Sequence, residues 1–382
     1  MEYPLQSFGG TEVLVRELLR GLSDFFEIVL VTDDETSLIK NTPHARYFVE
    51  HLRWNLAEAS QAASRQLADD LHKLRVRIAH FHSGGNYGWN MRRLGGSPHL
   101  YLAPHGIPCF TTSHGVFALL DGYCNPGRAT WQKALLLIPA WLGKMQTLLH
   151  TRQEFAVSKN DLRNLQSWYR PLAEKFGQIY HSQIDENTPP AEELPREKII
   201  LCVGTIGHRK GQATLARAFA GIAADYPGWK LILAGKKTEL ELVRQIEATA
   251  SVPGMAHRIE MREGLNDAEI NRLFRTASVF AMPSVAEGLG LSLQEALWHG
   301  CPVVGSRVGG IPELIDHQSN GLLVNPGSED ELAVGLENLM EDDAFRKRLA
   351  NQTRSSILRK GMTSRAMISR YQKIYDDVVE AG

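Results

Sequence analysis

The stretch SVAEGLGLSLQEALWHGCPVVGSRVGG, residues 284–310, decides how this chain is expected to fold. It follows a short apolar run at 277–282, which predicts a buried strand, and it opens with a glycine-spaced turn. After the turn, Leu293, Ala296 and Leu297 recur at helical spacing, so a helix is expected there. The sequence therefore predicts a strand, a loop and a helix in succession, which is typical of α/β proteins.

The loop of this stretch offers a surface for an anion. Gly288 and Gly290 lack side chains, so the backbone N–H groups of residues 289–291 can approach a ligand closely at a helix start. Glu287 in the loop and Glu295 about two helical turns later bracket that surface. These features suggest a sugar joined through a diphosphate to a nucleoside. The alternative interpretation is an ordinary strand, turn and helix with solvent-exposed glutamates.

Length and composition describe an ordinary folded protein. The chain has 382 residues, of which 43% are hydrophobic and 22% charged, and it is long enough for two domains. Its formal net charge of −1 argues against a nucleic-acid binder. The four cysteines (Cys109, Cys124, Cys202 and Cys301) are far apart, which indicates neither a disulfide framework nor a zinc site. We expect no metal and no cofactor.

The sequence favours a cytoplasmic protein. No signal-peptide pattern opens the chain, and the most apolar run, residues 134–143, is too short for a membrane span and contains a proline. Trp131, Lys133, Trp141 and Lys144 surround this run. Such a segment can rest on a membrane surface, which would place the protein peripherally on the inner face of the membrane. A buried helix pair is the alternative interpretation.

The order of predicted elements divides the chain into two α/β halves. The second half is the more regular, with strands predicted at 198–204, 229–235, 259–264, 277–282, 302–306 and 320–324. The first half has strands predicted at 27–32, 76–81, 100–106 and 154–158. Residues 185–198 are rich in proline and glutamate without an apolar period, so we interpret them as a linker. The predicted domains are therefore 1–184 and 199–365.

The segment from Pro283 to Pro326 resembles the E-x7-E signature of the retaining glycosyltransferase family 4, whose members have the GT-B fold. The resemblance implies two Rossmann-like doubly wound domains that face each other across a cleft. It also implies a final helix, residues 366–382, that crosses back to the first domain. The implied reaction is metal-independent transfer of a hexosyl group from a nucleoside diphosphate sugar, with retention, to a hydroxyl acceptor. Sugars and lipid-linked sugars are the expected acceptors, in glycan, polysaccharide or glycolipid synthesis.

Two histidines of the first half are candidates for contact with the donor sugar. The run LYLAPHG at 100–106 is predicted to be a strand that delivers His105 to its carboxyl end, where open α/β sheets bind ligands. In the family, a His-Gly at such a strand end lies against the donor sugar, and the resemblance carries to His105. His114, which precedes Gly115 in a segment that we interpret as a loop, is the second choice.

A basic turn after the first strand of the second half is the candidate diphosphate site. Arg209 and Lys210 are adjacent cations at the carboxyl end of a predicted strand, where they could neutralise a diphosphate. The family usually has an arginine where this chain has Thr205, so we expect Arg209 to replace it. The alternative interpretation is a solvated loop with ordinary basic residues.

The resemblance implies further contacts to the donor. Gly10 belongs to a Gly-Gly loop that lies beneath the donor phosphates in the family, and the donor is also expected to contact Gly288, Leu289, Gly290 and Leu291. The nucleoside is expected against Gly235, Leu265 and Glu295.

The chain departs from the family pattern at two places in its first half. The family has a strand of about six apolar residues before the Gly-Gly loop, whereas residues 1–8 do not resemble one. Either the recorded start lies downstream of the true start, or the domain lacks its first strand. The Asn and Gly of the family's Asn-Gly-Ile-Asp turn are absent from residues 179–185, so no role is assigned there.

Three other functions compete with transfer. A nucleotide-sugar epimerase of GT-B fold would use the same donor site, but it would need further acid/base carboxylates, which we do not identify. A non-catalytic homologue that binds nucleotide sugars fits a chain whose first domain is incomplete. A nicotinamide-linked oxidoreductase requires G-x-G-x-x-G after the first strand, and that pattern is absent there.

Overall fold

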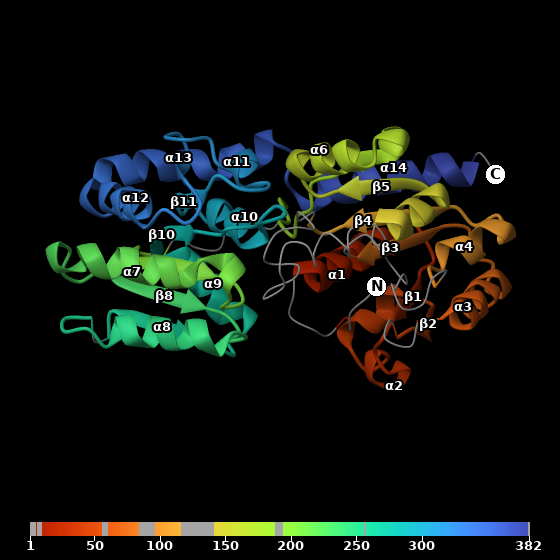
Figure 1. The fold of residues 1–382 in the computed structure, drawn as a ribbon, viewed down its shortest axis with the longest axis horizontal. Coiled ribbons are helices and arrows are strands. Elements are labelled where there is room, and N and C mark those ends of the chain that lie inside the picture. The colour runs from red at the N-terminus through yellow and green to blue at the C-terminus, as the bar shows by residue number, and fades with distance from the viewer. Residues whose placement is uncertain are drawn as a thin grey trace. The chain divides into compact units, whose positions relative to one another are not determined.

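The computed structural model describes residues 5, 10–55, 60–83, 96–115, 141–187, 194–255 and 257–380. The chain forms two compact units. Unit 1 comprises residues 1–183 and 364–382, and unit 2 comprises residues 184–363. Each unit consists of parallel strands and helices (Figure 1), as the predicted class of two Rossmann-like domains requires.

Unit 2 contains one parallel sheet of six strands in the order β12-β11-β10-β7-β8-β9. Counted within the unit this is the order 3-2-1-4-5-6 of doubly wound sheets, in which the strand order reverses between β7 and β10. The strands are β7 (Glu197–Val203), β8 (Lys230–Ala234), β9 (Ile259–Arg262), β10 (Ala277–Met282), β11 (Val303–Ser306) and β12 (Gly321–Val324). All six strands predicted for this half are confirmed.

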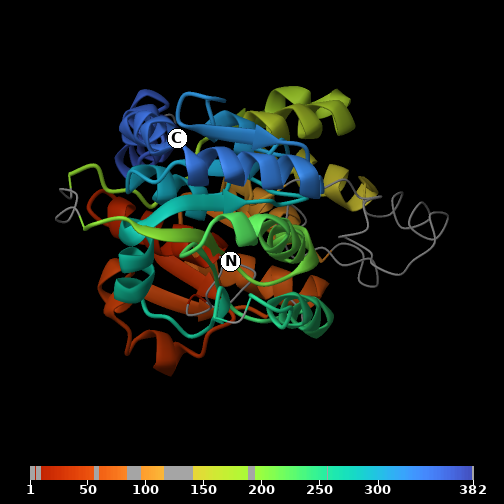
Figure 2. The same cartoon turned by 90° about the vertical axis from the view of Figure 1, so that its left-hand side faces the viewer.

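Helices cover both faces of this sheet, which explains why its strands are continuously apolar (Figure 2). One face carries α7 (Gln212–Ile222), α8 (Leu240–Ala250) and α12 (Glu329–Glu341), which pack side by side. The other carries α9 (Asp267–Thr276), α10 (Leu291–Trp298) and α13 (Asp343–Arg359), where α10 contacts both neighbours. The short helix α11 (Ile311–Leu314) follows β11 and packs on it.

Unit 1 is built on two separate parallel sheets. Four strands form the sheet β3-β4-β5-β6, and β1 pairs only with β2 within the described residues. The strands are β1 (Val29–Thr32), β2 (Glu50–Arg53), β3 (Ala79–Ser83), β4 (Cys109–Ser113), β5 (Thr151–Ala156) and β6 (Phe176–Gln178). The helices are α1 (Gly10–Leu22), α2 (Thr36–Ile39), α3 (Gln61–Lys73), α4 (His99–Leu102), α6 (Lys159–Trp168) and α14 (Ser364–Glu380), with another at 141–149.

The last helix, α14, belongs to unit 1 although unit 2 separates the two in sequence. Its Tyr371 hydroxyl is 3.0 Å from Thr112 Oγ1 on β4 and 2.9 Å from His181 Nε2. Its Tyr375 hydroxyl hydrogen-bonds to His80 Nδ1 on β3. The helix therefore closes the core of unit 1 with two buried tyrosines.

The strand predicted at 100–106 is wrong. These residues form the end of α4 and a 3₁₀ turn, Ala103–His105, and the strand of this region is β4, which begins nine residues after the start of the predicted strand. Its polar residues suggested a loop, yet the Thr111 and Thr112 hydroxyls are paired with His99 and His80, respectively. Because these buried hydroxyls have partners, a threonine-rich segment can occupy the middle of a sheet.

Smaller predictions had mixed outcomes. Strands β2 and β6 were missed, because four and three residues give little periodicity. Ser158 is the N-cap of α6, since its side chain accepts from the Asp161 N–H. Asn266 caps α9 and forms a capping box with Glu269. The question of a first strand concerns residues 1–8, of which only Leu5 is described.

Candidate functional site

The candidate site lies at the carboxyl edge of the unit 2 sheet, where β7 and β10 are neighbours. The loop after β7 carries Arg209 and Lys210 in a short 3₁₀ turn, and the loop after β10 carries Glu287. The strand order reverses between these two strands, which is where doubly wound sheets bind ligands. The topology therefore brings together two loops that are far apart in sequence.

Glu287 lies between the two predicted cations. Its Oε2 is 2.6 Å from Lys210 Nζ, and its Oε1 is 3.3 Å from Arg209 Nη1. Arg209 also donates to the Ala286 carbonyl, and its own carbonyl accepts from the Val285 N–H at 2.9 Å. The Glu287 side chain is only 9% exposed, against 15% for Lys210 and 24% for Arg209. The two loops thus form a single charged cluster.

The charge of this cluster is set by two opposing effects. Burial by itself would raise the pKa of Glu287, because it disfavours the carboxylate. Lys210 and Arg209 outweigh burial through their charges and hydrogen bonds, so the pKa lies below its ordinary value. Glu287 is therefore ionised at neutral pH, and the three side chains together carry a net charge of one positive unit.

Two glycines are required by the geometry of these loops. Gly211 has φ +68°, and a Cβ there would lie 2.1 Å from the Pro283 carbonyl oxygen. Gly290 has φ +93° and is the N-cap residue of α10. The helix begins directly after it, so the first N–H groups of α10 have no partner within the helix. An anion can be bound at such a helix start.

Three polar residues that the sequence analysis did not single out support the cluster. The Ser284 hydroxyl donates to Glu287 Oε2 at 3.3 Å. Gln212, which is 2% exposed, donates to the Thr205 carbonyl and accepts from the Gly207 N–H, so it ties down the loop that carries the cations. Ser292 in α10 donates to the Val203 carbonyl at the end of β7. The signal available in the sequence was proximity to a predicted site residue: Gln212 lies two residues after Lys210, and Ser284 lies three residues before Glu287.

The predicted nucleoside contacts lie in the same unit. Gly235 follows β8, and a Cβ there would lie 2.1 Å from the Gly204 carbonyl oxygen after β7. Leu265 follows β9, so both residues lie at the carboxyl edge of the sheet. Glu295 lies on the second turn of α10, partly exposed. Leu289 is itself 4% exposed, so only its backbone can face a ligand.

His105 does not have the position from which its role was inferred. It ends a 3₁₀ turn before β4, so it lies at the amino end of that strand. There its Nε2 is 3.1 Å from Asp69 Oδ1, and its ring stacks on His72. The histidine at the carboxyl end of β4 is His114. His114, the second choice, therefore has the strand-end position that was expected of His105.

His114, which is partly buried, contacts two buried histidines of unit 1, His82 and His181. Its Nε2 is 3.1 Å from His82 Nδ1, and its ring centroid is 5.1 Å from that of His181. Burial lowers the pKa of His114 to about 3, so its imidazole is neutral at pH 7. Gly10, the other predicted contact in this unit, is the exposed first residue of α1.

Other predicted features have little bearing on the site. Cys109, Cys202 and Cys301 are buried free thiols, and Cys124 lies outside the described residues. In the described part of the chain, no group of three or more His, Cys, Asp or Glu side chains is arranged to bind a metal ion. None of the helices found there has the length and apolar character needed to cross a bilayer. Most of the apolar run at 134–143 also lies outside the described residues.

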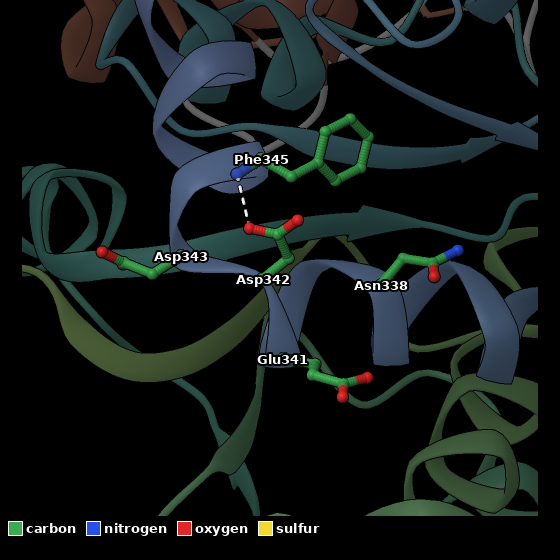
Figure 3. Close-up of a pocket in the computed structure, with 5 residues that line it drawn as sticks. All are labelled: Asn338, Glu341, Asp342, Asp343 and Phe345. Atoms are coloured by element: carbon green, nitrogen blue, oxygen red, sulfur yellow. Dashed lines mark hydrogen bonds between the residues drawn. The ribbon is translucent and has the colours of Figure 1, made fainter.

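Unit 2 also has a hollow, whose lining residues are shown in Figure 3. It has a volume of about 640 Å³ and is lined by Asn338, Glu341, Asp342, Asp343 and Phe345 at the junction of α12 and α13. Asp342 caps α13 by accepting from the Phe345 N–H. Because α12 runs back from the carboxyl edge of the sheet, its last residues lie at the amino edge. This hollow is therefore not part of the candidate site.

Comparison with known families agrees with this geometry. The family described as Glycosyltransferase Family 4 matches residues 8–181, and the family described as Glycosyl transferases group 1 matches residues 183–356. The two matches follow each other and cover both units. The chain belongs to the group 1 glycosyltransferases of family 4. The resemblance inferred from the E-x7-E segment is thereby confirmed.

Curated relatives match part of the chain. An uncharacterized glycosyltransferase of Methanocaldococcus jannaschii is 32% identical over 164 residues, which is 43% of this chain and 41% of that protein. A GDP-mannose-dependent alpha-(1-6)-phosphatidylinositol monomannoside mannosyltransferase of Mycobacterium tuberculosis is 32% identical over 156 residues, 39% of this chain and 40% of that one. The chain thus spans about two fifths of the length of the curated relatives that it matches.

Solved structures share the fold over the whole chain. Sucrose-phosphate synthase from Thermosynechococcus elongatus matches with a TM-score of 0.76 at 19% identity, covering 98% of this chain and 94% of that one. Anabaena HepE, solved in complex with UDP and glucose, matches with a TM-score of 0.73 at 16% identity, covering 97% and 96%. Together with the parallel sheets of the two units, these matches establish the GT-B fold.

Proposed function

We propose that this protein transfers a hexosyl group from a nucleoside diphosphate sugar to a hydroxyl acceptor, with retention of anomeric configuration and without a metal. The observation that carries the proposal is the cluster of Glu287, Arg209 and Lys210 beside the start of α10. It combines cations for a diphosphate with a carboxylate for sugar hydroxyls. HepE was solved with UDP and glucose, which supports a nucleotide sugar as the donor class.

Departure of the nucleoside diphosphate is the difficult step, because negative charge grows on the phosphate as the glycosidic bond breaks. Lys210, Arg209 and the first N–H groups of α10 are the groups that would stabilise this charge. Arg209 takes this role in place of the arginine that the family has where this chain has Thr205. The residues that hold them in place, Gln212 and Ser292, reduce the reorganisation required.

Glu287 retains the capacity to bind the sugar. A carboxylate oxygen can accept two hydrogen bonds. Oε2 accepts from Lys210 and Ser284, whereas Oε1 accepts from Arg209 alone within the described residues. Oε1 can therefore accept one hydroxyl of the donor sugar without the loss of either cation. Glu295 on α10 would accept from the ribose diol, with Gly235 and Leu265 near the base.

His114 is the histidine that we propose for the donor sugar. It lies at the carboxyl end of β4, and its imidazole is neutral. A neutral imidazole can donate one hydrogen bond to a sugar hydroxyl without repelling a cationic transition state. This assignment replaces the one that the sequence suggested for His105.

The test is release of nucleoside diphosphate from a panel of nucleotide sugars, with and without sugar or lipid-linked acceptors. We expect release that depends on an acceptor, persists with EDTA, and gives a product whose anomeric proton coupling matches that of the donor. Glu287→Gln should abolish release, whereas Glu247→Gln on the exposed face of α8 should not. Binding without release would instead support a non-catalytic homologue, and conversion of the donor sugar without acceptor would support an epimerase.

The proposal also includes contact of unit 1 with a membrane surface. Leu142 and Leu149, in the helix at 141–149, are 55% and 62% exposed. We propose that this part of unit 1 contacts the membrane surface peripherally when the acceptor is lipid-linked. Sedimentation with anionic vesicles should detect it, and Leu142→Glu should weaken it. Equal sedimentation of both proteins would contradict this contact.

A further inference from the structure

The loop that carries Glu287 also contacts a third loop, the one that follows β11. In the sheet, β10 lies between β7 and β11, so the loop after β10 has a neighbour on each side. On one side, the Arg209 carbonyl in the loop after β7 accepts from the Val285 N–H. On the other side, the Gly310 N–H in the loop after β11 donates to the Gly288 carbonyl at 2.8 Å. The backbone around Glu287 is therefore held from two directions.

The loop after β11 comes closer than a side chain would permit at two positions. A Cβ added at Gly309 would lie 1.7 Å from the Glu287 carbonyl oxygen and 3.5 Å from the Glu287 Cα. A Cβ added at Gly310 would lie 2.5 Å from the Gly288 carbonyl oxygen and 3.0 Å from the Leu289 Cα. Non-bonded heavy atoms pack best at about 3.5–4.0 Å. A side chain at either position would therefore displace the loop after β10.

The two glycines contact different parts of the site. Gly309 lies against the backbone of Glu287, so a side chain there would move the carboxylate away from its cations. Gly310 lies against residues 288 and 289, which directly precede the start of α10. A side chain at Gly310 would instead move the first N–H groups of that helix.

Backbone conformation separates two reasons for glycine in this loop. Gly309 has φ +52°, a conformation that favours glycine by itself. Gly310 has φ −84°, which any residue can adopt, so only the close approach requires glycine there. Gly327, after β12, is the opposite case: its φ is +76°, but an added Cβ meets nothing within 4 Å. The three positions therefore distinguish strain from close approach.

A small displacement of Glu287 is enough to break its contacts. Its Oε2 is 2.6 Å from Lys210 Nζ, and a shift of about 1 Å would take this pair beyond hydrogen-bond distance. The clash at Gly309 requires a shift of this order. Without Lys210, the charge that most strongly opposes burial is lost, so the pKa of Glu287 would rise.

We propose that the loop after β11 is part of the site and that Gly309 and Gly310 are positioning residues. Gly309 positions the carboxylate of Glu287, and Gly310 positions the N–H groups at the start of α10. This inference rests on the proposed function, because these are the groups that would bind the donor sugar and its diphosphate. Each glycine acts by lacking a side chain, and neither supplies a group to the reaction.

The first test measures Glu287 itself, by NMR titration of its carboxyl carbon, with Glu287→Gln to assign the signal. We expect Gly309→Ala to raise the pKa of Glu287. It should also lower kcat about 10²-fold, the loss that a misplacement of about 1 Å can cause. Gly327→Ala has a similar φ but open space around it, so it should change neither quantity.

The second test uses inorganic pyrophosphate as the probe and measures its binding by calorimetry. Gly310→Ala should weaken binding about two- to fivefold, because the anion loses part of its interaction with the displaced helix start. Gly309→Ala should not weaken it, since Arg209 and Lys210 remain in their own loop. A purely structural role of the two glycines would not produce this difference.

Two results would overturn the proposal. One is an unchanged titration of Glu287 in a folded Gly309→Ala protein, and the other is equal pyrophosphate binding by Gly310→Ala and Gly327→Ala. If Gly309→Ala does not fold, Gly310→Ala decides, because its φ suits alanine. Absence of transfer by the unsubstituted protein would contradict the proposed function alone, since neither the titration nor pyrophosphate binding requires turnover.

Discussion

The two units have the same design but differ at the centre of the sheet. In unit 2 the order β12-β11-β10-β7-β8-β9 is unbroken, and β7 is paired on both sides. In unit 1, β1 and β3 lie on either side of a groove at the corresponding position. A buried central strand normally supplies the hydrogen bonds and apolar contacts that hold a parallel sheet together. Within the described residues, the strands of unit 2 are therefore the more completely paired of the two sets, and we expect them to be the more stable.

The largest difference that we expect between the two units is in their stability at acidic pH. Burial lowers the pKa of His80, His99 and His114 in unit 1 to about 3, and it also lowers those of His82 and His181. These histidines are neutral when folded and protonate near pH 6.5 when unfolded. Their contribution to stability is therefore present above pH 6.5 and is lost as pH falls towards 3.

Unit 2 has a different response to acid. Burial lowers the pKa of His299 in unit 2 to about 4. The pKa of Glu287 lies below that of an ordinary carboxylic acid, so Glu287 stays ionised at mildly acidic pH. We expect hydrogen exchange at pH 5 to show loss of protection in β3 and β4 before β7 and β10. Simultaneous loss of protection in both units would contradict the comparison. The variant His80→Gln should make the stability of unit 1 less sensitive to acid.

Removal of a cation from the cluster should have the next largest effect. Lys210→Met should lower kcat by about 10²- to 10³-fold, the usual loss for a donor that stabilises a leaving group. It also removes the charge that most strongly opposes the effect of burial on Glu287, so the pKa of Glu287 should rise. The pH–rate profile should then shift its acidic limb upward. Lys347→Met, an exposed residue of α13, serves as the control.

A pair of glycines compares backbone constraint in the two units. Gly211 in unit 2 and Gly106 in unit 1 have nearly equal φ angles, +68° and +71°. An added Cβ at Gly106 meets nothing within 4 Å, whereas at Gly211 it meets the Pro283 carbonyl. Gly106→Ala should cost about 1–2 kcal/mol of unfolding free energy. Gly211→Ala should cost more in urea denaturation and should also lower activity; equal costs would contradict the close packing.

Helix caps should give the smallest effects. Ser158 caps α6 in unit 1, and Asn266 caps α9 in unit 2. Replacement of either by alanine should cost about 1 kcal/mol of unfolding free energy, measured by urea denaturation. Asp267→Ala, next to the true cap, should cost only a few tenths of a kcal/mol. A larger loss at Asp267 than at Asn266 would contradict the observed capping box.

Sequence reasoning was most successful where apolar runs and loops repeat regularly. All six strands of unit 2 were predicted, because a sheet covered on both faces requires continuous apolar strands. Glu287, Arg209 and Lys210 were singled out before their contact was visible, since residues at adjacent strand ends converge. Their hydrogen bonds to each other could not be predicted, because these depend on loop conformation.

The failures in unit 1 have a physical cause. Leu100 and Leu102 alternate as in a strand, but they precede a proline that begins a 3₁₀ turn. The true strand, β4, has three hydroxyl residues in five, and buried partners for those hydroxyls come from distant segments. No local pattern reveals such partners. The stretch before His114 was consequently interpreted as a loop, although His114 directly follows a strand.

The two tyrosines of α14 have a consequence for the order in which the protein is made. Ribosomes release residues 184–363 before residues 364–382, although the latter complete the core of unit 1. During synthesis, unit 2 can fold as soon as it emerges, while unit 1 must wait for Tyr371 and Tyr375 to reach His80 and Thr112. The half of the chain that is translated first is therefore the last to reach its native state.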